Sequence, residues 1–252
     1  AGAGGGVFYY PTGITTDGTN LYVADRNNHR IRKIVISSGA VTTLAGSSAG
    51  TADGTGTSAQ FNKPNGITTD GTNLYTVSWT NNTVRKIVIS TGEVSTLAGT
   101  AGTSGNTDAT GTSARFSWPF GITTDGTNLY IAEVNTRSIR KVVISSGVVT
   151  TFAGSPSGSS GSTDATGTSA RFSNPEAITS DGTNLYVADT QNHRIRKIVI
   201  SSGAVTTLAG SGSGNTDATG TSARFAQPWG ITTDGTSLYV TDRLNDKVRK
   251  IE

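Results

Sequence analysis

The chain has 252 residues, 33 of them glycine, a formal net charge of +3 and only 15% charged residues. This composition is rich in turn-forming residues and lacks the high charge of disordered chains, so we expect a folded chain of many short strands. No run of 18 apolar residues is present, and no membrane insertion is expected. The absence of cysteine excludes disulfides and thiolate chemistry.

One segment recurs five times along the chain. Its first copy contains Phe8, Pro11 and Gly13, and the same three residue types return at steps of 53, 55, 56 and 53 residues, with alanine replacing the glycine in the fourth copy. A fixed unit followed by a Gly/Ser/Thr-rich stretch of variable length is typical of a repeat architecture. We therefore predict a single domain over residues 1–252, with repeats at about 8–60, 61–115, 116–171, 172–224 and 225–252, the last incomplete.

The β-branched and aromatic runs of the first copy predict four strands, at residues 13–16, 21–25, 30–36 and 40–45. Two tight turns, at residues 17–20 and 37–39, join the first pair and the last pair. Four short antiparallel strands make one blade of an all-β propeller. Because each blade has apolar residues on both faces, it must pack between neighbours, and we expect Phe8 and its equivalents to fill the gaps.

Each copy resembles an NHL repeat. The resemblance lies in Pro-x-Gly-Ile, Asp-Gly-x-x-Leu-Tyr-Val-Ala-Asp, Asn-x-x-Ile-Arg-Lys-Ile and Gly-x-Val-x-Thr-x-Ala-Gly, which run from Pro11 to Gly46 in the first copy. It implies a β-propeller of NHL type with five blades of four antiparallel strands, or six blades if the chain is a fragment. Propellers of this family bind proteins, RNA or small ligands, and only a few are enzymes, so the resemblance specifies fold more than function.

The fifth copy ends at Glu252, so its third strand is shortened and its fourth is missing. Residues 1–7 are one candidate for a replacement strand, although their glycines are poor strand formers. The other interpretation is that the native protein continues. An incomplete last blade also presents an unpaired strand edge, and self-assembly through it is an expected mode of association.

Several repeated charged residues are predicted to belong to the scaffold. Arg32 and its equivalents recur with an acidic residue seven positions earlier, except that Ser78 replaces the acid in the second copy, and we expect arginine–carboxylate pairs that hold strands together. His29 and His193 share one repeat position and are predicted to make a loop contact. Aspartates in the variable stretches are predicted to cap the backbone, with calcium as the alternative: Asp53, Asp108, Asp164 and Asp217.

The copies differ mainly where the blade-to-blade connections and the loops between strands two and three emerge, at one face of the predicted propeller. Three positions vary there: the residue before the proline, the residue after it, and the residue after strand two. One interpretation is that the large rings fill gaps between blades. The other is a rim of aromatic anchors with polar neighbours, which suits a binding site. The candidate ligand-binding residues are Tyr10, Arg26, Lys63, Trp79, Trp118, Phe120, Glu176, Trp229 and Arg243.

These patterns predict a non-enzymatic binding module, extracellular or at a bacterial cell surface, whose partner is a protein or a carbohydrate. The alternative is a structural spacer or assembly subunit of a larger surface protein or polymer. A metal-dependent lyase-type propeller is less favoured, because two histidines and no nucleophile–base set are present; no catalytic residue, metal or cofactor is predicted. No nucleic acid is expected either, because the basic residues are spread over all five copies.

Overall fold

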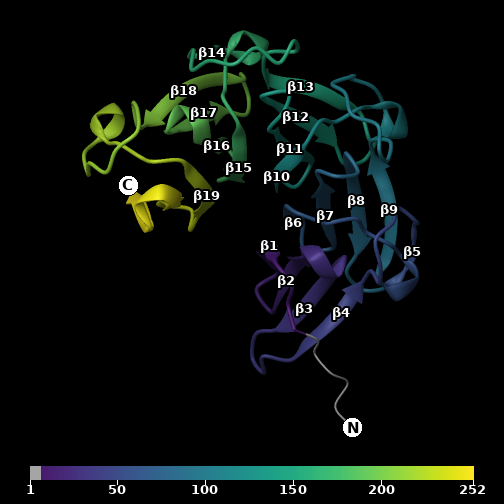
Figure 1. Ribbon diagram of the computed structural model, residues 1–252. Coiled ribbons are helices and arrows are strands. Elements are labelled where there is room, and N and C mark those ends of the chain that lie inside the picture. The colour runs from purple at the N-terminus through teal and green to yellow at the C-terminus, as the bar shows by residue number, and fades with distance from the viewer. Residues whose placement is uncertain (1–6) are drawn as a thin grey trace. The chain divides into compact units, whose positions relative to one another are not determined.

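The computed structural model describes residues 7–252, and β-strands with short 3-10 turns make up its regular structure (Figure 1). The strands form five antiparallel sheets of three to five strands. These sheets are the five blades of an all-β propeller, as predicted. The chain divides into two compact units, Ala1–Pro119 and Phe120–Glu252. The replacement strand proposed for residues 1–7 lies almost wholly outside the described residues.

The first unit contains two blades. Blade 1 has the strand order β1-β2-β3-β4, and its strands begin and end within two residues of the predicted bounds: β1 (Pro11–Thr16), β2 (Asn20–Asp25), β3 (Arg30–Val35) and β4 (Val41–Ala45). Blade 2 has the order β5-β9-β8-β7-β6: β5 (Gly54–Thr55), β6 (Ile67–Thr69), β7 (Asn73–Ser78), β8 (Thr83–Val88) and β9 (Glu93–Ala98).

The second unit contains the other three blades. Blade 3 consists of β10 (Pro119–Thr124), β11 (Asn128–Glu133), β12 (Ser138–Val143) and β13 (Val149–Gly154). Blade 4 consists of β14 (Ala165–Thr166), β15 (Pro175–Ser180), β16 (Asn184–Asp189), β17 (Arg194–Val199) and β18 (Ala204–Ala209). Blade 5 has three strands, as predicted: β19 (Pro228–Thr233), β20 (Leu238–Asp242) and β21 (Lys247–Ile251).

Two short strands were not predicted. β5 and β14 lie in the variable stretches, which the sequence presents as loops, and each pairs with the outer strand of its blade (Figure 1). In blade 4 Ala165 pairs with Val205 and Thr166 with Ala204. Two residues are too few to show a strand periodicity, which is why the sequence pattern does not reveal them.

Three of the repeated phenylalanines pack between blades of one unit, as predicted, whereas Phe8 of the first copy is half-buried and stacks with Arg32. Phe61 is buried with Ile31 of blade 1 and Leu74 of blade 2. In the second unit Phe172 packs in the same way between blades 3 and 4, and Phe225 between blades 4 and 5. Apolar burial between neighbouring sheets is therefore the main source of stability in each unit.

The tight turns between the first two strands of each blade are closed by aspartate. In blade 4 the side chain of Asp181 accepts hydrogen bonds from the N–H groups of Thr183 and Asn184, at 2.8 and 2.6 Å, and from the Tyr186 hydroxyl at 2.9 Å. Burial opposes ionisation of Asp181, but these hydrogen bonds outweigh it and hold the pKa at about 2. The turns therefore act as rigid ends of each blade.

Gly46 ends blade 1 at a place where no side chain fits. Its φ is +96°, and an added Cβ would collide with the His29 carbonyl oxygen and lie 2.7 Å from Cδ2 of Phe61. We expect Gly46→Ala to lower the free energy of unfolding by about 2 kcal/mol or more. Gly18 is the matched control, because its φ of +87° is similar but no atom lies within 4 Å of the added Cβ. Urea unfolding should show a smaller loss for Gly18→Ala; equal losses would contradict the steric argument.

Candidate functional site

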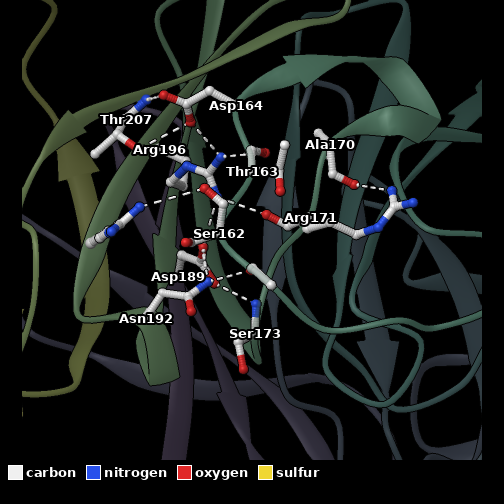
Figure 2. A network of polar contacts seen from close by, with 12 residues as sticks. Ser162, Thr163, Asp164, Ala170, Arg171, Ser173, Asp189, Asn192, Arg196 and Thr207 are labelled. Atoms are coloured by element: carbon white, nitrogen blue, oxygen red, sulfur yellow. Dashed lines mark hydrogen bonds and ion pairs between the residues drawn. The ribbon is translucent and has the colours of Figure 1, made fainter.

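A network of hydrogen bonds from a buried arginine holds the connection between blades to the blade that it enters. The network is most complete in blade 4 (Figure 2). The guanidinium of Arg196 donates to the carboxylate of Asp189 at 2.9 Å and to that of Asp164 at 2.6 Å. It also donates to the carbonyl oxygens of Arg171 and Thr163, at 2.8 and 3.1 Å. Arg196 therefore joins strands β16 and β17 to the connection that enters the blade, which confirms the predicted structural role of the arginine–carboxylate pair.

The same pair recurs in three other copies, at Arg32–Asp25, Arg140–Glu133 and Arg249–Asp242. In the second copy, where Ser78 replaces the acid, Arg85 pairs instead with Asp53 at 2.7 Å. Asp53 also accepts the N–H of Thr96, and Asp164 that of Thr207, so the predicted backbone capping is confirmed at these two aspartates. The sequence did not reveal that the capping aspartates also bind arginine.

The residue before each proline is held in one backbone conformation whatever its side chain. Five such residues have φ between 53° and 56°: Tyr10, Lys63, Trp118, Asn174 and Gln227. The loop of the preceding blade fixes three of them. The N–H of Lys63 donates to Nδ1 of His29 at 3.2 Å, that of Gln227 to Nδ1 of His193 at 3.1 Å, and that of Trp118 to Oδ1 of Asn82 at 3.1 Å.

These hydrogen bonds confirm the predicted loop contact of the two histidines. Burial and the nearby charge of Lys63 lower the pKa of His29, which favours the neutral ring whose Nδ1 accepts a hydrogen bond. These hydrogen bonds thus fix the main chain of the residue before proline, whereas its side chain is free to differ between copies.

In the first unit four predicted site residues form one group, which we call the Arg26 cluster: Tyr10, Arg26, Trp79 and Trp118. The guanidinium carbon of Arg26 lies 5.3 Å from the ring centre of Tyr10 and 4.6 Å from that of Trp79. The rings of Trp79 and Trp118 meet edge to face, with centres 5.6 Å apart. Tyr10 is 62% exposed and Trp118 49% exposed, whereas Arg26 and Trp79 are half-buried.

In the second unit the other predicted residues form the Glu176 cluster: Phe120, Glu176, Trp229 and Arg243. The rings of Phe120 and Trp229 meet edge to face, with centres 5.5 Å apart, and the guanidinium carbon of Arg243 lies 4.3 Å from the ring centre of Trp229. Glu176 is only 7% exposed, and its Oε2 has no hydrogen-bond partner among residues 7–252. Burial raises the pKa of Glu176 to about 7, against the opposing charge of Arg243.

Eight of the nine predicted site residues therefore gather into two clusters, each within one unit. Lys63 is exposed and lies beside His29 rather than within the ring contacts. The interpretation that the rings only fill gaps between blades does not fit the exposure of Tyr10 and Trp118. Stacking of arginine on tryptophan was missed, although Arg26 and Trp79 occupy equivalent positions in consecutive copies, which are neighbours in a propeller.

The buried carboxyl of Glu176 predicts an unusual pH dependence of stability. Since its pKa is about 7 in the folded chain and 4.5 ordinarily, the folded state retains a proton that the unfolded state loses as the pH rises between these values. The free energy of unfolding should therefore fall by on the order of 2 kcal/mol across this window. Urea unfolding at about pH 5 and about pH 8 should show this loss in the wild type and not in Glu176→Gln. Parallel behaviour of the two proteins would contradict it.

Among residues 7–252, no three or more His, Asp or Glu side chains are arranged to bind a metal ion. Within the same range no helix is long and apolar enough to cross a membrane.

Comparison with known sequences agrees with the repeat pattern. The NHL repeat family model matches residues 8–34. NHL repeat-containing protein 2 is 28% identical over 280 residues in Gallus gallus and 26% identical in Homo sapiens, in each case over 96% of this chain. The chain spans 38% of the length of these relatives. The predicted resemblance to NHL repeats is confirmed.

Solved structures agree on the fold. An auxiliary nutrient binding protein from Bacteroides thetaiotaomicron has a TM-score of 0.72 and 23% identity, covering 96% of this chain and 58% of its own. A nidogen/laminin complex contains a chain with a TM-score of 0.69 and 18% identity, covering 97% of this chain and 76% of its own. At these sequence identities, the similarity to the solved structures supports the propeller fold and nothing further.

Proposed function

We propose that the chain, an NHL-repeat β-propeller, is a non-enzymatic binding module that recognises a protein partner through the Arg26 cluster. The observation that carries this proposal is the exposure of Tyr10 and Trp118 on either side of a stacked arginine and tryptophan. Tryptophan, tyrosine and arginine are the residues that most often dominate the binding energy of protein interfaces.

The stacking in the Arg26 cluster supports a binding role, because it holds these side chains in place and does not merely leave them exposed. Arg26 is held between the rings of Tyr10 and Trp79, and Trp118 rests against Trp79. The backbone of Trp118 is also fixed by Asn82. Side chains ordered in advance lose little conformational entropy when a partner binds, so more of the contact energy appears as affinity.

The charges around the cluster favour an acidic partner. Arg26 and Lys63 both carry positive charge there, and Lys63 is exposed. The two acidic residues of the neighbouring loops are already neutralised, because Asp25 pairs with Arg32 and Asp53 with Arg85. A partner segment that carries carboxylates beside apolar side chains would therefore complement this surface.

The comparisons support a binding role in general terms, since proteins described as auxiliary nutrient binding proteins and a chain of a nidogen/laminin complex share this fold. We extend the proposal to a location outside the cell or at a bacterial cell surface. It rests on the neutral, Ser/Thr/Gly-rich composition and on the bacterial origin of the nutrient-binding proteins.

A selection from a random peptide library displayed on phage tests the proposal. We expect peptides rich in acidic and aromatic residues to be enriched on the wild-type chain and to bind Tyr10→Ser/Trp118→Ser at least about tenfold more weakly. The control is Ile36→Ser, because Ile36 is an exposed apolar residue at a tight turn. No enrichment, or equal binding to both variants, would overturn the proposal and favour the structural spacer.

A glycan array probed with the same variants separates the two partner classes. The proposal expects no glycan whose binding depends on Tyr10 and Trp118. A glycan that binds the wild type and is lost in Tyr10→Ser/Trp118→Ser would reassign this surface to carbohydrate.

A further inference from the structure

We infer that the Glu176 cluster is a second binding site, separate from the protein-binding surface, and that it takes a neutral polyhydroxylated ligand: a monosaccharide or the terminal sugar of a glycan. The observation behind this inference is a buried carboxylate oxygen that has no partner and lies in a cluster with two aromatic rings and an exposed arginine. None of these features is required by the repeat, because the two repeat positions that supply the four residues vary among the five copies.

The strand arrangement places Glu176 among the rings. Phe120, Glu176 and Trp229 are each the second residue of the first strand of their blade, in β10, β15 and β19. β15 packs against β19, and the carbonyl oxygen of Glu176 is in close contact with Gly121 of β10. Phe120, Glu176 and Trp229 therefore hold equivalent positions on the first strands of three consecutive blades, and Glu176 comes from the middle one.

A buried carboxyl without a partner is costly to fold. Removing a polar oxygen from water without replacing its hydrogen bond destabilises a protein by about 1–3 kcal/mol, and more if the group is charged. Arg243 does not relieve this cost by direct bonding, since Oε2 has no hydrogen-bond partner among the described residues and the guanidinium stacks on Trp229 instead. A ligand hydroxyl that donates to Oε2 would supply the missing partner.

The charges of the cluster select the class of ligand. A cation would be repelled by Arg243 and an anion by Glu176, whereas a neutral ligand with several hydroxyls can donate to the carboxylate and accept from the guanidinium. The apolar face of a sugar ring also packs well against an indole. Arg243 is the exposed member of the cluster and its guanidinium stacks on Trp229, so a sugar ring that packs against this indole must displace it.

The protonation state of Glu176 agrees with this ligand class. With the pKa raised to about 7, the carboxyl is present both protonated and ionised near neutral pH. It can therefore donate or accept a hydrogen bond, as each sugar hydroxyl can.

Tryptophan fluorescence and calorimetric titration with glucose, galactose, mannose and N-acetylglucosamine test this inference on the wild-type chain, with choline and acetate as charged probes. A glycan array distinguishes a free sugar from a terminal sugar. We expect at least one neutral sugar to bind in one of these forms and neither charged probe to bind. Binding of choline or acetate, or of no sugar in either form, would overturn the inference.

Variants locate the site. Glu176→Met should weaken sugar binding by about tenfold or more while its thermal midpoint stays equal or rises, because an apolar side chain of similar size replaces an unpartnered carboxyl. Glu176→Gln, which keeps hydrogen-bonding capacity, provides a second variant and should lose less affinity. Leu244→Ala, an exposed neighbour of Arg243, should bind normally. Unchanged sugar affinity in Glu176→Met would overturn the inference.

Peptide binding by the Arg26 cluster and sugar binding by the Glu176 cluster can be tested independently. Tyr10→Ser/Trp118→Ser should bind the sugar as the wild type does, and Glu176→Met should bind the selected peptides as the wild type does. Loss of sugar binding in the first variant would contradict a separate site.

Discussion

Replacing Arg196 with methionine should lower the free energy of unfolding by about 3–5 kcal/mol. Arg196 and its partner Asp189 are both fully buried, and the carboxylate lies 2.9 Å from the guanidinium. Without the arginine, the carboxyl of Asp189 is left buried beside an apolar side chain and must lose its charge or water must enter. Two backbone carbonyl oxygens, of Arg171 and Thr163, lose their donors as well.

Arg85 provides the matched comparison within the same chain. It occupies the equivalent repeat position, but its carboxylate partner is Asp53, which is 51% exposed and can be hydrated when the arginine is removed. We expect Arg85→Met to lose roughly half as much stability as Arg196→Met in urea unfolding. Equal losses would show that burial of the acidic partner does not determine the cost.

Reversing the charge of Arg26 should weaken the binding of the selected acidic peptides by about 100-fold. Arg26→Glu removes the cation that stacks on Tyr10 and Trp79, and it places a carboxylate opposite the acidic partner. Loss of the stacking contacts speeds dissociation, and repulsion between the new carboxylate and the acidic peptide also slows association. The affinity is measured by surface plasmon resonance with a purified synthetic peptide from the selection.

Arg243 is the control for this variant, because it holds the same repeat position and stacks on Trp229 in the second unit. Arg243→Glu should leave peptide affinity unchanged. Lys63→Glu should have a smaller effect that fades at high salt, since Lys63 is exposed and lies outside the ring contacts. An equal loss in Arg243→Glu and Arg26→Glu would indicate a nonspecific charge effect and contradict recognition by the Arg26 cluster.

The scaffold could be predicted from the sequence because five copies of one unit agree. Strand bounds, tight turns, the packing of Phe61 and the pair of Arg32 with Asp25 all follow from residues that return at a fixed spacing. The strands β5 and β14 and the pairing of Arg85 with Asp53 could not be predicted. They arise in the stretches of variable length, where no periodicity marks which residue reaches the blade.

The candidate site could be predicted only in part. Disagreement among the copies identified Tyr10, Trp118 and Glu176 as positions that the repeat does not fix. The grouping into two clusters depends on how far rings and guanidinium groups extend across neighbouring strands, as in the stacking of Arg26 on Trp79. The burial of Glu176 likewise could not be predicted, because the residue type at a single position does not indicate what packs around it.

Site-specific photo-crosslinking tests whether the peptide binds at the Arg26 cluster. A photoreactive phenylalanine analogue is placed at position 118 in one protein and at position 36 in another, and each is irradiated with a purified peptide from the selection. We expect a crosslinked product from position 118, in the Arg26 cluster, and none from position 36, at a tight turn. A product of equal yield from position 36, or none from position 118 while the peptide is bound, would contradict it.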